Sequence, residues 1–301
     1  MNVSIIIVNY NTTQLLLQCL DSITAQTHGA TYEIIVVDNG SHEEELVPLR
    51  HDRRITLLEQ HQNLGFGRAN NVGAAHAQGE HLFLLNPDTL LVNDAVSLLC
   101  QHLTSNPTTG ICGGNIFDAG MQPIHAHDTL PPSILQELDI VFAHLYSKLV
   151  FGKNAWFNHT EKNMKVALIT GADIMIRRSA WEAVGGFDPA FFMYYEDADL
   201  CVNVNQQGYD VVNVPQARII HLEGKSFSES RARTERYFTG RSVFFRKHYS
   251  AFYNKMADLL NVLTLRTGVF AFHLLGKPQA GVYRQRLDVY RQIMKQAHER
   301  A

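Results

Sequence analysis

The sequence has little of the residues and segments that mark several specialised classes of protein. Its 301 residues include four cysteines, widely spaced and without metal-ligand or redox spacing, which favours buried thiols in a reducing compartment. The net charge of −3 argues against a nucleic-acid binder. No apolar run has the length of a transmembrane helix, and no basic segment with a cleavage site precedes the first apolar run. We therefore expect a globular, cytoplasmic protein.

The first half of the sequence alternates short apolar runs with amphipathic segments. This alternation is typical of α/β proteins with a mostly parallel, doubly wound sheet. The predicted strands are Val3–Val8, Glu33–Val37, Ile55–Glu59, His81–Leu85 and Gly110–Ile116. The predicted helices between them are Thr12–Thr27, Gly67–Ala77 and Asp94–Leu103.

The pattern weakens after Asp118. Three prolines interrupt residues 118–165, which predicts an insertion with a short helix near Ile134–Leu149, forming a lid-like loop. Regular structure is expected again over Val166–Arg177, followed by strands at Asp210–Val214 and Ala217–His221. From Arg231 the pattern is helical. We therefore predict one domain over 1–230 and a helical extension over 231–301.

Polar residues follow three predicted strands. The residues concerned are Asn9, Tyr10, Asp38, Asn39, Asn86 and Asp88. The carboxyl ends of parallel strands meet at one edge of a sheet, where open α/β sheets build their ligand crevices. Asp88 follows Pro87, which stops the strand, and its carboxylate suits a divalent cation that carries nucleotide phosphates. Asp38 can accept hydrogen bonds from a base or ribose. Each cluster alone also fits a turn, but three at one edge favour a ligand site.

A glycine-containing loop, Asn63–Asn70, follows the third strand and opens a helix. Asn70 stands where a dinucleotide-binding fingerprint needs its third glycine, and the loop follows the third strand rather than the first, so a dehydrogenase is disfavoured. Arg68 and the backbone N–H groups of the helix start would suit a phosphate. A close-packed helix start is the alternative.

Three carboxylates, Glu196, Asp197 and Asp199, follow the aromatic run Phe191–Tyr195. A carboxylate near aromatic side chains and other acids tends to have a raised pKa, which favours general-base chemistry. The alternative, acids that complement a helix N-terminus, does not explain the aromatic run. Two further segments contain histidine. His221 ends a strand and could complete a mixed carboxylate–histidine metal site, whereas residues 125–128 form a short His-rich tract that is only a compositional indication.

Taken together, these segments resemble the family-two glycosyltransferases of GT-A fold, particularly the bacterial rhamnosyltransferase-like branch. The matching segments are Ser4–Asn11, Glu33–Ser41, Asn63–Asn71, Leu84–Thr89, Thr170–Arg177, Gly185–Asp199 and Ile219–Ser226. The resemblance implies a nucleotide-diphospho-sugar donor, a divalent cation (Mg²⁺ or Mn²⁺) and inversion at the anomeric carbon. The usual Asp-x-Asp motif is here Asn86-Pro87-Asp88, so one carboxylate remains.

The resemblance also implies roles for individual residues. Asp38 would contact the nucleobase, Asp88 and His221 would bind the metal, and Asp197 would be the catalytic base. The expected donor-binding set is Asn9, Tyr10, Asp38, Asn39, Arg68, Asn86, Asp88 and Arg241, and the expected acceptor-side set is Tyr194, Tyr195 and Glu196. We expect the acceptor to bind between the insertion at 118–165 and the aromatic run.

The function implied is transfer of a sugar, with dTDP-L-rhamnose the favoured donor, to a saccharide or polyprenyl-linked saccharide in cell-surface polysaccharide synthesis. The alternatives are transfer of a hexosyl or galactofuranosyl group from a UDP-sugar, or a non-catalytic nucleotide-sugar-binding protein. A nucleotidyltransferase is disfavoured because the early Gly-rich triphosphate loop is missing.

The segment after Arg231 combines basic residues with aromatic and aliphatic ones. Such a helix can lie in the plane of an anionic membrane surface, which predicts peripheral contact with the inner face of the plasma membrane. The alternative is a helical pair that packs on the core or on a second subunit in a homodimer.

Overall fold

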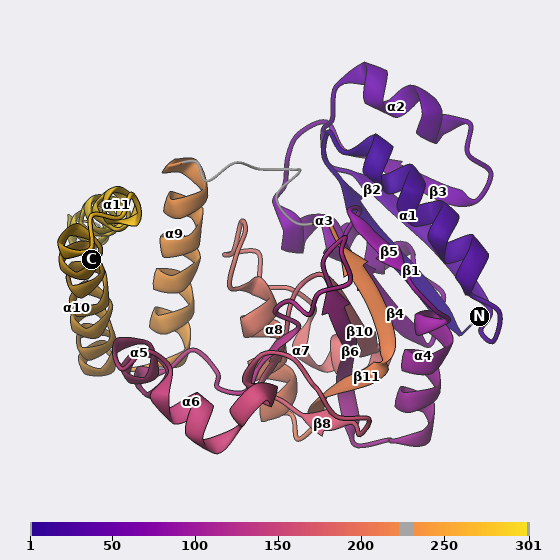
Figure 1. Cartoon of the computed structure of the whole chain (residues 1–301). Helices are drawn as coiled ribbons and strands as arrows, with labels where there is room; N and C mark the ends of the chain where they lie inside the picture. The colour runs from indigo at the N-terminus through magenta and orange to yellow at the C-terminus, as the bar shows by residue number, and fades with distance from the viewer. Residues whose placement is uncertain (1, 223–230, 300–301) are drawn as a thin grey trace. The chain divides into compact units, whose positions relative to one another are not determined.

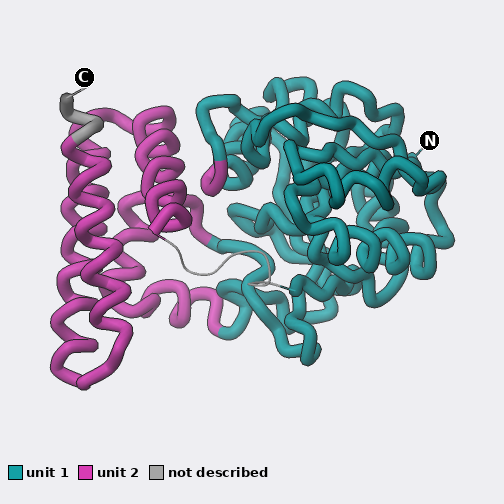
Figure 2. Tube along the Cα trace, turned by 90° about the horizontal axis from the view of Figure 1, so that it is seen from above, with its two compact units in different colours: residues 1–129, 153–192, 196–226 teal, residues 130–152, 193–195, 227–301 magenta. Residues whose placement is uncertain are grey.

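The computed structural model describes residues 2–222 and 231–299 (Figure 1). The chain divides into two compact units, coloured separately in Figure 2. Unit 1 comprises residues 1–129, 153–192 and 196–226, and unit 2 comprises residues 130–152, 193–195 and 227–301. Unit 2 thus combines the C-terminal helices with part of the predicted insertion and with three residues of the aromatic run. Part of the Ile219–Ser226 motif, residues 223–226, lies outside the described residues.

In the described part of unit 1, nine strands form one sheet in the order β3-β2-β1-β4-β10-β6-β11-β5, with β8 paired to β11. The strands are β1 (Val3–Asn9), β2 (Tyr32–Asp38), β3 (Ile55–Glu59), β4 (His81–Leu85), β5 (Thr89–Leu91), β6 (Thr109–Phe117), β8 (Met164–Lys165), β10 (Asp173–Arg177) and β11 (Asp210–His221). The predicted α/β class with a largely parallel sheet is confirmed.

The sheet departs from a uniformly parallel one at its centre. Strands β3, β2, β1 and β4 are parallel to one another, and β6 is parallel to β11. Strand β10 lies between β4 and β6 and is antiparallel to both. The segment 166–177 therefore holds two strands, β9 (Leu168–Ile169) and β10, separated by a turn. Conversely, the two strands predicted within 210–221 are one strand, β11, with a register shift between Asn213 and Arg218.

Helices cover both faces of this sheet, which explains why β1 and β4 are buried along their whole length. On one face α1 and α4 pack against the row Val3, Ile5 and Ile7. On the other face α3 approaches so closely that a Cβ on Gly73 would lie 2.5 Å from Ile6 Cγ2. The helices of unit 1 are α1 (Thr13–Gln26), α2 (Glu43–Arg50), α3 (Phe66–His76), α4 (Ala95–Ser105), α7 (Arg178–Val184) and α8 (Glu196–Gln206).

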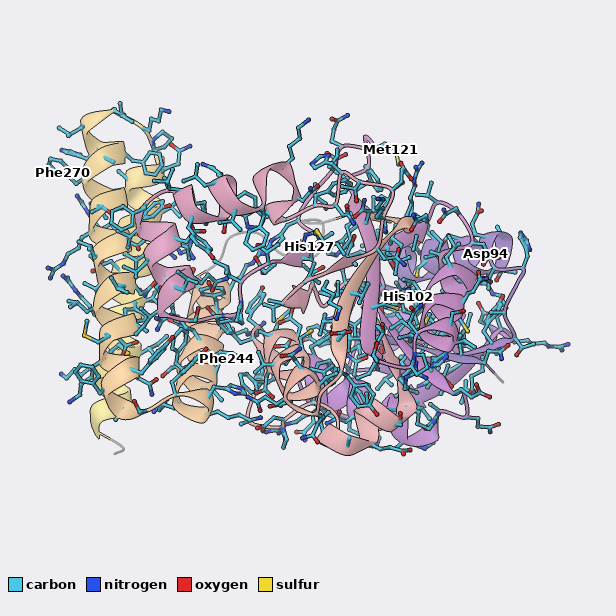
Figure 3. All side chains as sticks on the ribbon, turned by 90° about the horizontal axis from the view of Figure 1, so that it is seen from below. Asp94, His102, Met121, His127, Phe244 and Phe270 are labelled. Carbon is cyan, nitrogen blue, oxygen red and sulfur yellow. The ribbon has the colours of Figure 1, made fainter. Side chains whose placement is uncertain are left out.

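Two smaller features of unit 1 come from the region of the predicted insertion. Strand β7 (His127–Asp128) pairs with β9 in a separate two-stranded antiparallel sheet. A short 3-10 helix, Gly152–Ala155, follows in the sequence where the chain passes from unit 2 back to unit 1. His127, the first residue of β7, is labelled in Figure 3.

Unit 2 is helical throughout its described elements. They are α5 (Ile134–Val141), α6 (Leu145–Val150), α9 (Arg231–His248), α10 (Ala251–Leu274) and α11 (Gln279–Glu299). The helix predicted at 134–149 is thus two short helices. Helix α11 packs against α9 and α10 around an apolar cluster that includes Phe238, Leu265 and Tyr290. No helix among the described residues is long and apolar enough to span a bilayer.

Candidate active site

The strand directions bring the predicted site residues to one edge of the sheet. Strands β1, β2 and β4 end at the same edge, and the register pairs Asn9 with Asp38. Because β10 runs the opposite way, it begins at this edge, where Asp173 pairs with Leu85. Strand β11 ends there too, and His221 pairs with Thr89 at the start of β5. Residues distant in sequence therefore converge on the carboxyl ends of the parallel strands.

The loops after β1 and β2 form the first polar cluster, in which Asp38 is fully buried. Asn9 Nδ2 donates to Asp38 Oδ1 at 2.9 Å, and the backbone N–H groups of Gly40 and Ser41 donate to Oδ2 at 3.2 and 3.0 Å. Gly40 has φ +85°, a conformation that glycine adopts without strain. These bonds fix the carboxylate of Asp38 rigidly at the edge of the sheet.

Asn39 and Tyr10, the two other residues expected in this cluster, differ in how far their side chains are engaged within the protein. The side chain of Asn39 is engaged within the protein, because its Oδ1 accepts from Leu64 N–H at 2.8 Å and its Nδ2 lies 3.1 Å from Asn63 Oδ1. Tyr10 is 37 % exposed. Asn39 therefore holds the 63–64 loop, while Tyr10 is accessible to a ligand.

Asp88 and His221 form the second cluster. Asp88 Oδ1 lies 3.2 Å from His221 Nε2, and the side-chain nitrogen of Asn86 lies 3.5 Å from the same ring nitrogen. The backbone tightens the arrangement, since Leu222 N–H donates to the Asp88 carbonyl at 2.9 Å. The structure thus brings together the two residues that the sequence assigned to a metal, and places Asn86 beside them.

A short backbone segment, Gly171–Ala172, links this cluster to Asp197. The N–H of Asn86 donates to the Ala172 carbonyl at 3.0 Å. The N–H of the preceding residue, Gly171, donates to Asp197 Oδ2 at 3.0 Å. Two consecutive residues therefore hold the Asn86–Asp88 turn on one side and the expected base on the other.

Asp197 and its neighbour Glu196 begin helix α8, where Glu196 is buried and Asp197 is partly buried. Within the described residues, Asp197 accepts hydrogen bonds from the backbone N–H groups of Gly171 and Ala198. Glu196 Oε2 is buried without a hydrogen-bond partner. Burial, and then the charge of Asp197, raise the pKa of Glu196 to about 8, and burial is also the main cause that raises the pKa of Asp197. Carboxyl groups in such surroundings hold protons more tightly than free ones, as a general base requires.

The expected acceptor-side tyrosines precede these acids but belong to unit 2. Tyr194 and Tyr195 have φ of 71° and 70°, a left-handed conformation that side chains other than glycine rarely adopt. Within unit 2, Tyr195 donates its hydroxyl to that of Tyr237 at 3.2 Å. Gly240 on α9 leaves room for the Tyr194 carbonyl, which would lie 2.3 Å from an added Cβ. Strained backbone of this kind clusters at functional sites.

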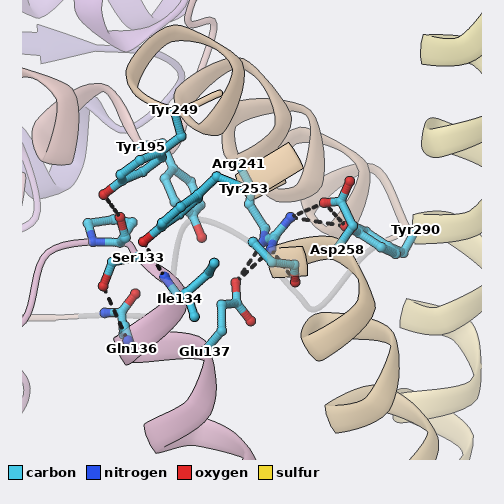
Figure 4. Close-up of polar contacts among 12 residues, drawn as sticks. Ser133, Ile134, Gln136, Glu137, Tyr195, Arg241, Tyr249, Tyr253, Asp258 and Tyr290 are labelled. Carbon is cyan, nitrogen blue, oxygen red and sulfur yellow. Dashed lines mark hydrogen bonds and ion pairs between the residues drawn. The ribbon is translucent and has the colours of Figure 1, made fainter. Parts of the chain in front are cut away.

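Both arginines expected to contact the donor have protein partners. Arg68 donates from Nε and Nη2 to the Pro189 carbonyl at 2.9 and 2.5 Å. Arg241 belongs to unit 2, is 1 % exposed, and donates to Glu137, Asp258 and the Ala257 carbonyl (Figure 4). Because its guanidinium is enclosed by side chains of unit 2, we leave Arg241 out of the donor-binding proposal.

One buried residue at this edge has no role in the sequence argument. Asp173 is fully buried, accepts the Gly114 N–H at 2.6 Å through Oδ2, and has no hydrogen-bond partner for Oδ1. Burial raises the pKa of Asp173 well above its ordinary value, and the charge of His221 lowers it in part. In the sequence, a polar residue at the start of an apolar run is the signal that could have indicated Asp173. Its position on the side of His221 depends on the antiparallel placement of β10.

Comparisons with known proteins identify the family to which the chain belongs. Residues 4–181 match the family model of glycosyl transferase family 2. The chain belongs to this family. The matched segment of the glycosyltransferase family 2 model includes Asp38 and Asp88 and ends before Asp197 and His221.

Two relatives and one solved structure show how similar the chain is to known proteins and over what share of their length. The chain is 30 % identical over 234 residues to the O-antigen biosynthesis protein RfbC of Myxococcus xanthus, covering 74 % of this chain and 17 % of that protein. It is 26 % identical to the N-acetylglucosaminyl-diphospho-decaprenol L-rhamnosyltransferase of Mycobacterium tuberculosis, covering 64 % and 67 %. The mannosyltransferase PcManGT of Pyrobaculum calidifontis, solved with GDP-Man and Mn²⁺, superposes with a TM-score of 0.59 at 17 % identity, covering 99 % and 86 %. The fold is therefore GT-A.

The chemistry of the second cluster fits a divalent cation, and the solved mannosyltransferase is one protein of this fold that contains Mn²⁺. Asp88 and His221 offer one carboxylate oxygen and one imidazole nitrogen at 3.2 Å from each other, a mixed set that suits Mn²⁺ better than Mg²⁺. Among the residues that the structure describes, no three His, Cys, Asp or Glu side chains are grouped to hold a metal. Such cations are commonly bound through one or two protein ligands together with substrate phosphates.

Proposed function

We propose that this chain is an inverting, metal-dependent glycosyltransferase that acts in cell-surface polysaccharide synthesis. The observation that carries the proposal is the link through Gly171 and Ala172. Backbone hydrogen bonds join these two residues to Asn86, which stands beside the proposed cation ligands Asp88 and His221, and to Asp197, the proposed base. Transfer from a nucleoside diphosphate needs these two elements, one for the leaving group and one for the attacking hydroxyl.

The residues divide the work as follows. Asp38, fixed by Asn9, binds the nucleobase or ribose of the donor, and Tyr10, Asn86 and Arg68 line the path to the diphosphate. Asp88 and His221 would hold the divalent cation, which when bound offsets the charge of the leaving diphosphate. Membership of family 2 and the mannosyltransferase solved with Mn²⁺ support this assignment.

Asp197 accepts the proton of the acceptor hydroxyl as that oxygen attacks the face of the sugar opposite the diphosphate. The new bond joins the acceptor oxygen to the anomeric carbon, and the bond from that carbon to the diphosphate oxygen breaks. One base is sufficient because the leaving group needs no proton, unlike that of a glycosidase, which works with two carboxylates.

The favoured donor is dTDP-L-rhamnose, and the favoured acceptor is a saccharide or polyprenyl-linked saccharide near Tyr194, Tyr195 and Glu196. The support is the name of the mycobacterial relative, a decaprenol-linked rhamnosyltransferase, at 26 % identity. Transfer of a hexosyl or galactofuranosyl group from a UDP-sugar is the alternative within the same fold. A non-catalytic nucleotide-sugar-binding protein would not need a base such as Asp197 linked to the cation ligands through Gly171 and Ala172.

A donor screen tests this proposal. Purified protein with Mn²⁺ is offered dTDP-L-rhamnose, UDP-sugars and GDP-sugars, with lipid-linked and free saccharide acceptors. Turnover with dTDP-L-rhamnose alone is the expected result. Turnover only with a UDP-sugar would overturn the rhamnose assignment, and binding without turnover for every donor would favour the non-catalytic reading.

The metal assignment is tested separately by calorimetry. Asp88→Ala should weaken the binding of donor and of Mn²⁺ together, because Asp88 would hold the cation that offsets the charge of the donor diphosphate. Asp94→Ala is the control, since Asp94 caps helix α4 and lies apart from the proposed ligands. Donor affinity that is equal with and without EDTA would contradict the metal role.

We further propose that helix α10 contacts the inner face of an anionic membrane. Its outward side carries large apolar residues, among them Phe270 at 66 % exposure (labelled in Figure 3), together with Lys255 and Arg266. Such a face binds lipid headgroups and acyl chains together. The expected result is salt-sensitive sedimentation with anionic vesicles, lost in Phe270→Ser/Leu274→Ser but kept in Val47→Ser. Concentration-dependent dimers without vesicle binding would favour the homodimer instead.

A further inference from the structure

Helices α5 and α6 of unit 2, labelled in Figure 1, bury polar side chains and expose apolar ones. Glu137, Asp139 and Ser147 are each at most 6 % exposed. The side chains on the outside are large and apolar, and their exposed fractions lie between 42 and 77 %. We call them the α5–α6 surface: Leu135, Phe142, Leu145, Tyr146, Leu149 and Val150. A helix on the surface of a globular protein normally has the opposite arrangement, so this one indicates an interaction surface.

Hydrogen bonds of the buried polar side chains fix this orientation. Glu137 Oε1 accepts from Arg241 Nε and Nη2 at 2.9 and 2.7 Å (Figure 4). Asp139 joins the two helices, because it accepts the Ser147 hydroxyl at 2.6 Å and the Ser147 N–H at 3.1 Å. Turning the apolar side chains inward would bring these acids out of their hydrogen bonds. The α5–α6 surface is therefore exposed in the folded unit.

The start of α5 and the turn after it are also held in place. Ile134 N–H donates to the Tyr253 hydroxyl at 2.8 Å, and the Tyr249 hydroxyl donates to the Pro132 carbonyl at 2.7 Å. Between the two helices, residues 143 and 144 have φ of 54° and 60°, which reverses the chain within a short turn. Helices α9 and α10 thus anchor the pair within unit 2.

The charge of the α5–α6 surface is positive. Residues 130–152 contain two acids, Glu137 and Asp139, and both are buried. Lys148 is exposed on α6, and the next lysine in the chain, Lys153, is exposed as well. An anionic lipid surface complements this composition, because apolar side chains enter the acyl boundary while lysines reach the headgroups. A second protein chain is disfavoured, because the cores of protein–protein interfaces are depleted in lysine.

The lengths of the two helices decide how they would meet a bilayer. Helix α5 has 8 residues and α6 has 6. At about 1.5 Å per residue they are roughly 12 and 9 Å long, against a hydrocarbon core of about 30 Å. Such helices cannot cross the core. They can lie in the plane of the interface, with the apolar side chains roughly 5–10 Å below the headgroups.

We propose that the α5–α6 surface docks on an anionic lipid bilayer. Phe142, Leu145 and Leu149 enter the boundary between headgroups and acyl chains, and Lys148 lies at the lipid phosphates. This goes beyond the contact proposed for α10, because α5 and α6 belong to the insertion and have an apolar face and a cation of their own. The proposal needs no sugar transfer, so it stands or falls separately from the transferase assignment.

A fluorescent label tests whether the surface enters lipid. Leu149→Cys in the full chain is labelled with an environment-sensitive fluorophore, since the four native cysteines are buried. Val47→Cys, an exposed apolar position on α2 in unit 1, is the matched control. Vesicles of phosphatidylglycerol and phosphatidylcholine should shift the emission to the blue at position 149 and leave it unchanged at position 47.

The same label identifies other occupants of the surface. Emission at position 149 that vesicles do not change would overturn the proposal. So would a blue shift without vesicles that grows with protein concentration, because a second copy would then cover the surface. At saturating lipid the shift should persist in the Phe270→Ser/Leu274→Ser background, and its loss there would show that α5 and α6 have no docking surface of their own.

Vesicle sedimentation measures the contributions of the individual side chains. Phe142→Ser/Leu149→Ser should lower the vesicle partition coefficient by roughly tenfold or more, because two exposed apolar side chains are lost. Lys148→Gln should lower it by about fivefold, and this loss should disappear at high salt. Val47→Ser and Arg53→Gln, both exposed in unit 1, are the controls and should leave it unchanged. Equal partitioning of wild type and Phe142→Ser/Leu149→Ser, with equal unfolding midpoints, would overturn the proposal.

Discussion

Unit 1 and unit 2 each contain a buried glutamate next to a partly exposed aspartate, and the two pairs have different partners. In unit 2, Glu137 and Asp258 share Arg241, which is bonded to both at 2.7 and 2.9 Å and to the Tyr290 hydroxyl (Figure 4). In unit 1, Asp197 accepts from backbone N–H groups, and among the described residues Glu196 Oε2 has no hydrogen-bond partner.

The difference in partners indicates a structural role for the acids of unit 2 and a chemical role for those of unit 1. A buried acid that only stabilises a fold is paired, because an unpaired buried charge costs several kcal/mol. Burial raises the pKa of Glu137, yet the charge and hydrogen bonds of Arg241 lower it in part, and Asp258 completes the neutralisation of that arginine. The acids of unit 1 lack such a partner, and perturbed carboxyl groups of this kind concentrate at functional sites.

The largest change in the free energy of unfolding is expected when Arg241 is removed from its ion pairs with Glu137 and Asp258. Arg241→Met leaves the buried Glu137 and the partly exposed Asp258 without their cation, so the free energy of unfolding should fall by about 3–5 kcal/mol. Chemical denaturation measures it. Arg246→Met on the same helix is the matched control, because Arg246 is exposed and should change the stability by less than about 0.5 kcal/mol. A loss for Arg241→Met no larger than the control's would show that the pairing is not structural.

Replacing Glu196 of unit 1 should instead raise the free energy of unfolding at high pH. With its pKa raised from 4.5 to about 8, folded Glu196 keeps a proton that the unfolded chain releases, so it lowers the stability as pH rises through that window. Glu196→Gln removes this penalty, which predicts equal stability near pH 4.5 and a gain of about 1 kcal/mol or more at pH 8. Denaturation at both values measures it. A variant less stable than wild type at pH 8 would contradict the picture.

A smaller effect is expected at the edge of the unit 2 network. The Tyr290 hydroxyl donates to Asp258 at 2.6 Å and lies 2.9 Å from Arg241 Nη1. Tyr290→Phe removes this bond but keeps the ring in the apolar cluster, so the expected loss is about 1 kcal/mol. Tyr283→Phe on the same helix is the control. If both substitutions cost the same, the hydroxyl does not contribute through the network.

The parts of the fold and site that were predictable from sequence are those with local causes. Pro87 ends a buried strand, and Asn9 and Asp38 follow apolar runs, so their place at one sheet edge follows from strand direction alone. The contact between Asp88 and His221 needs more, because it depends on the antiparallel pairing of β5 with β11. The central antiparallel strand β10 has no local signature, so the position of Asp173 could not be derived.

Long-range partners were the other limit. Arg241 was expected to face the donor diphosphate, but its partner Glu137 lies 104 positions away in the chain. No spacing rule connects the two. By contrast, His125 and Asp128 are three positions apart, so a local spacing brings them together.

The central claim is that Asp197 is a base rather than a member of a stabilising cluster, and one substitution tests it most directly. Asp197→Asn keeps the size of the side chain, so donor binding measured by calorimetry and the unfolding midpoint should match wild type, while the rate of sugar transfer falls by about 10²–10⁴-fold. Transfer at a near wild-type rate by a folded, donor-binding Asp197→Asn variant would contradict the account and would move the base to Glu196 or Asp199.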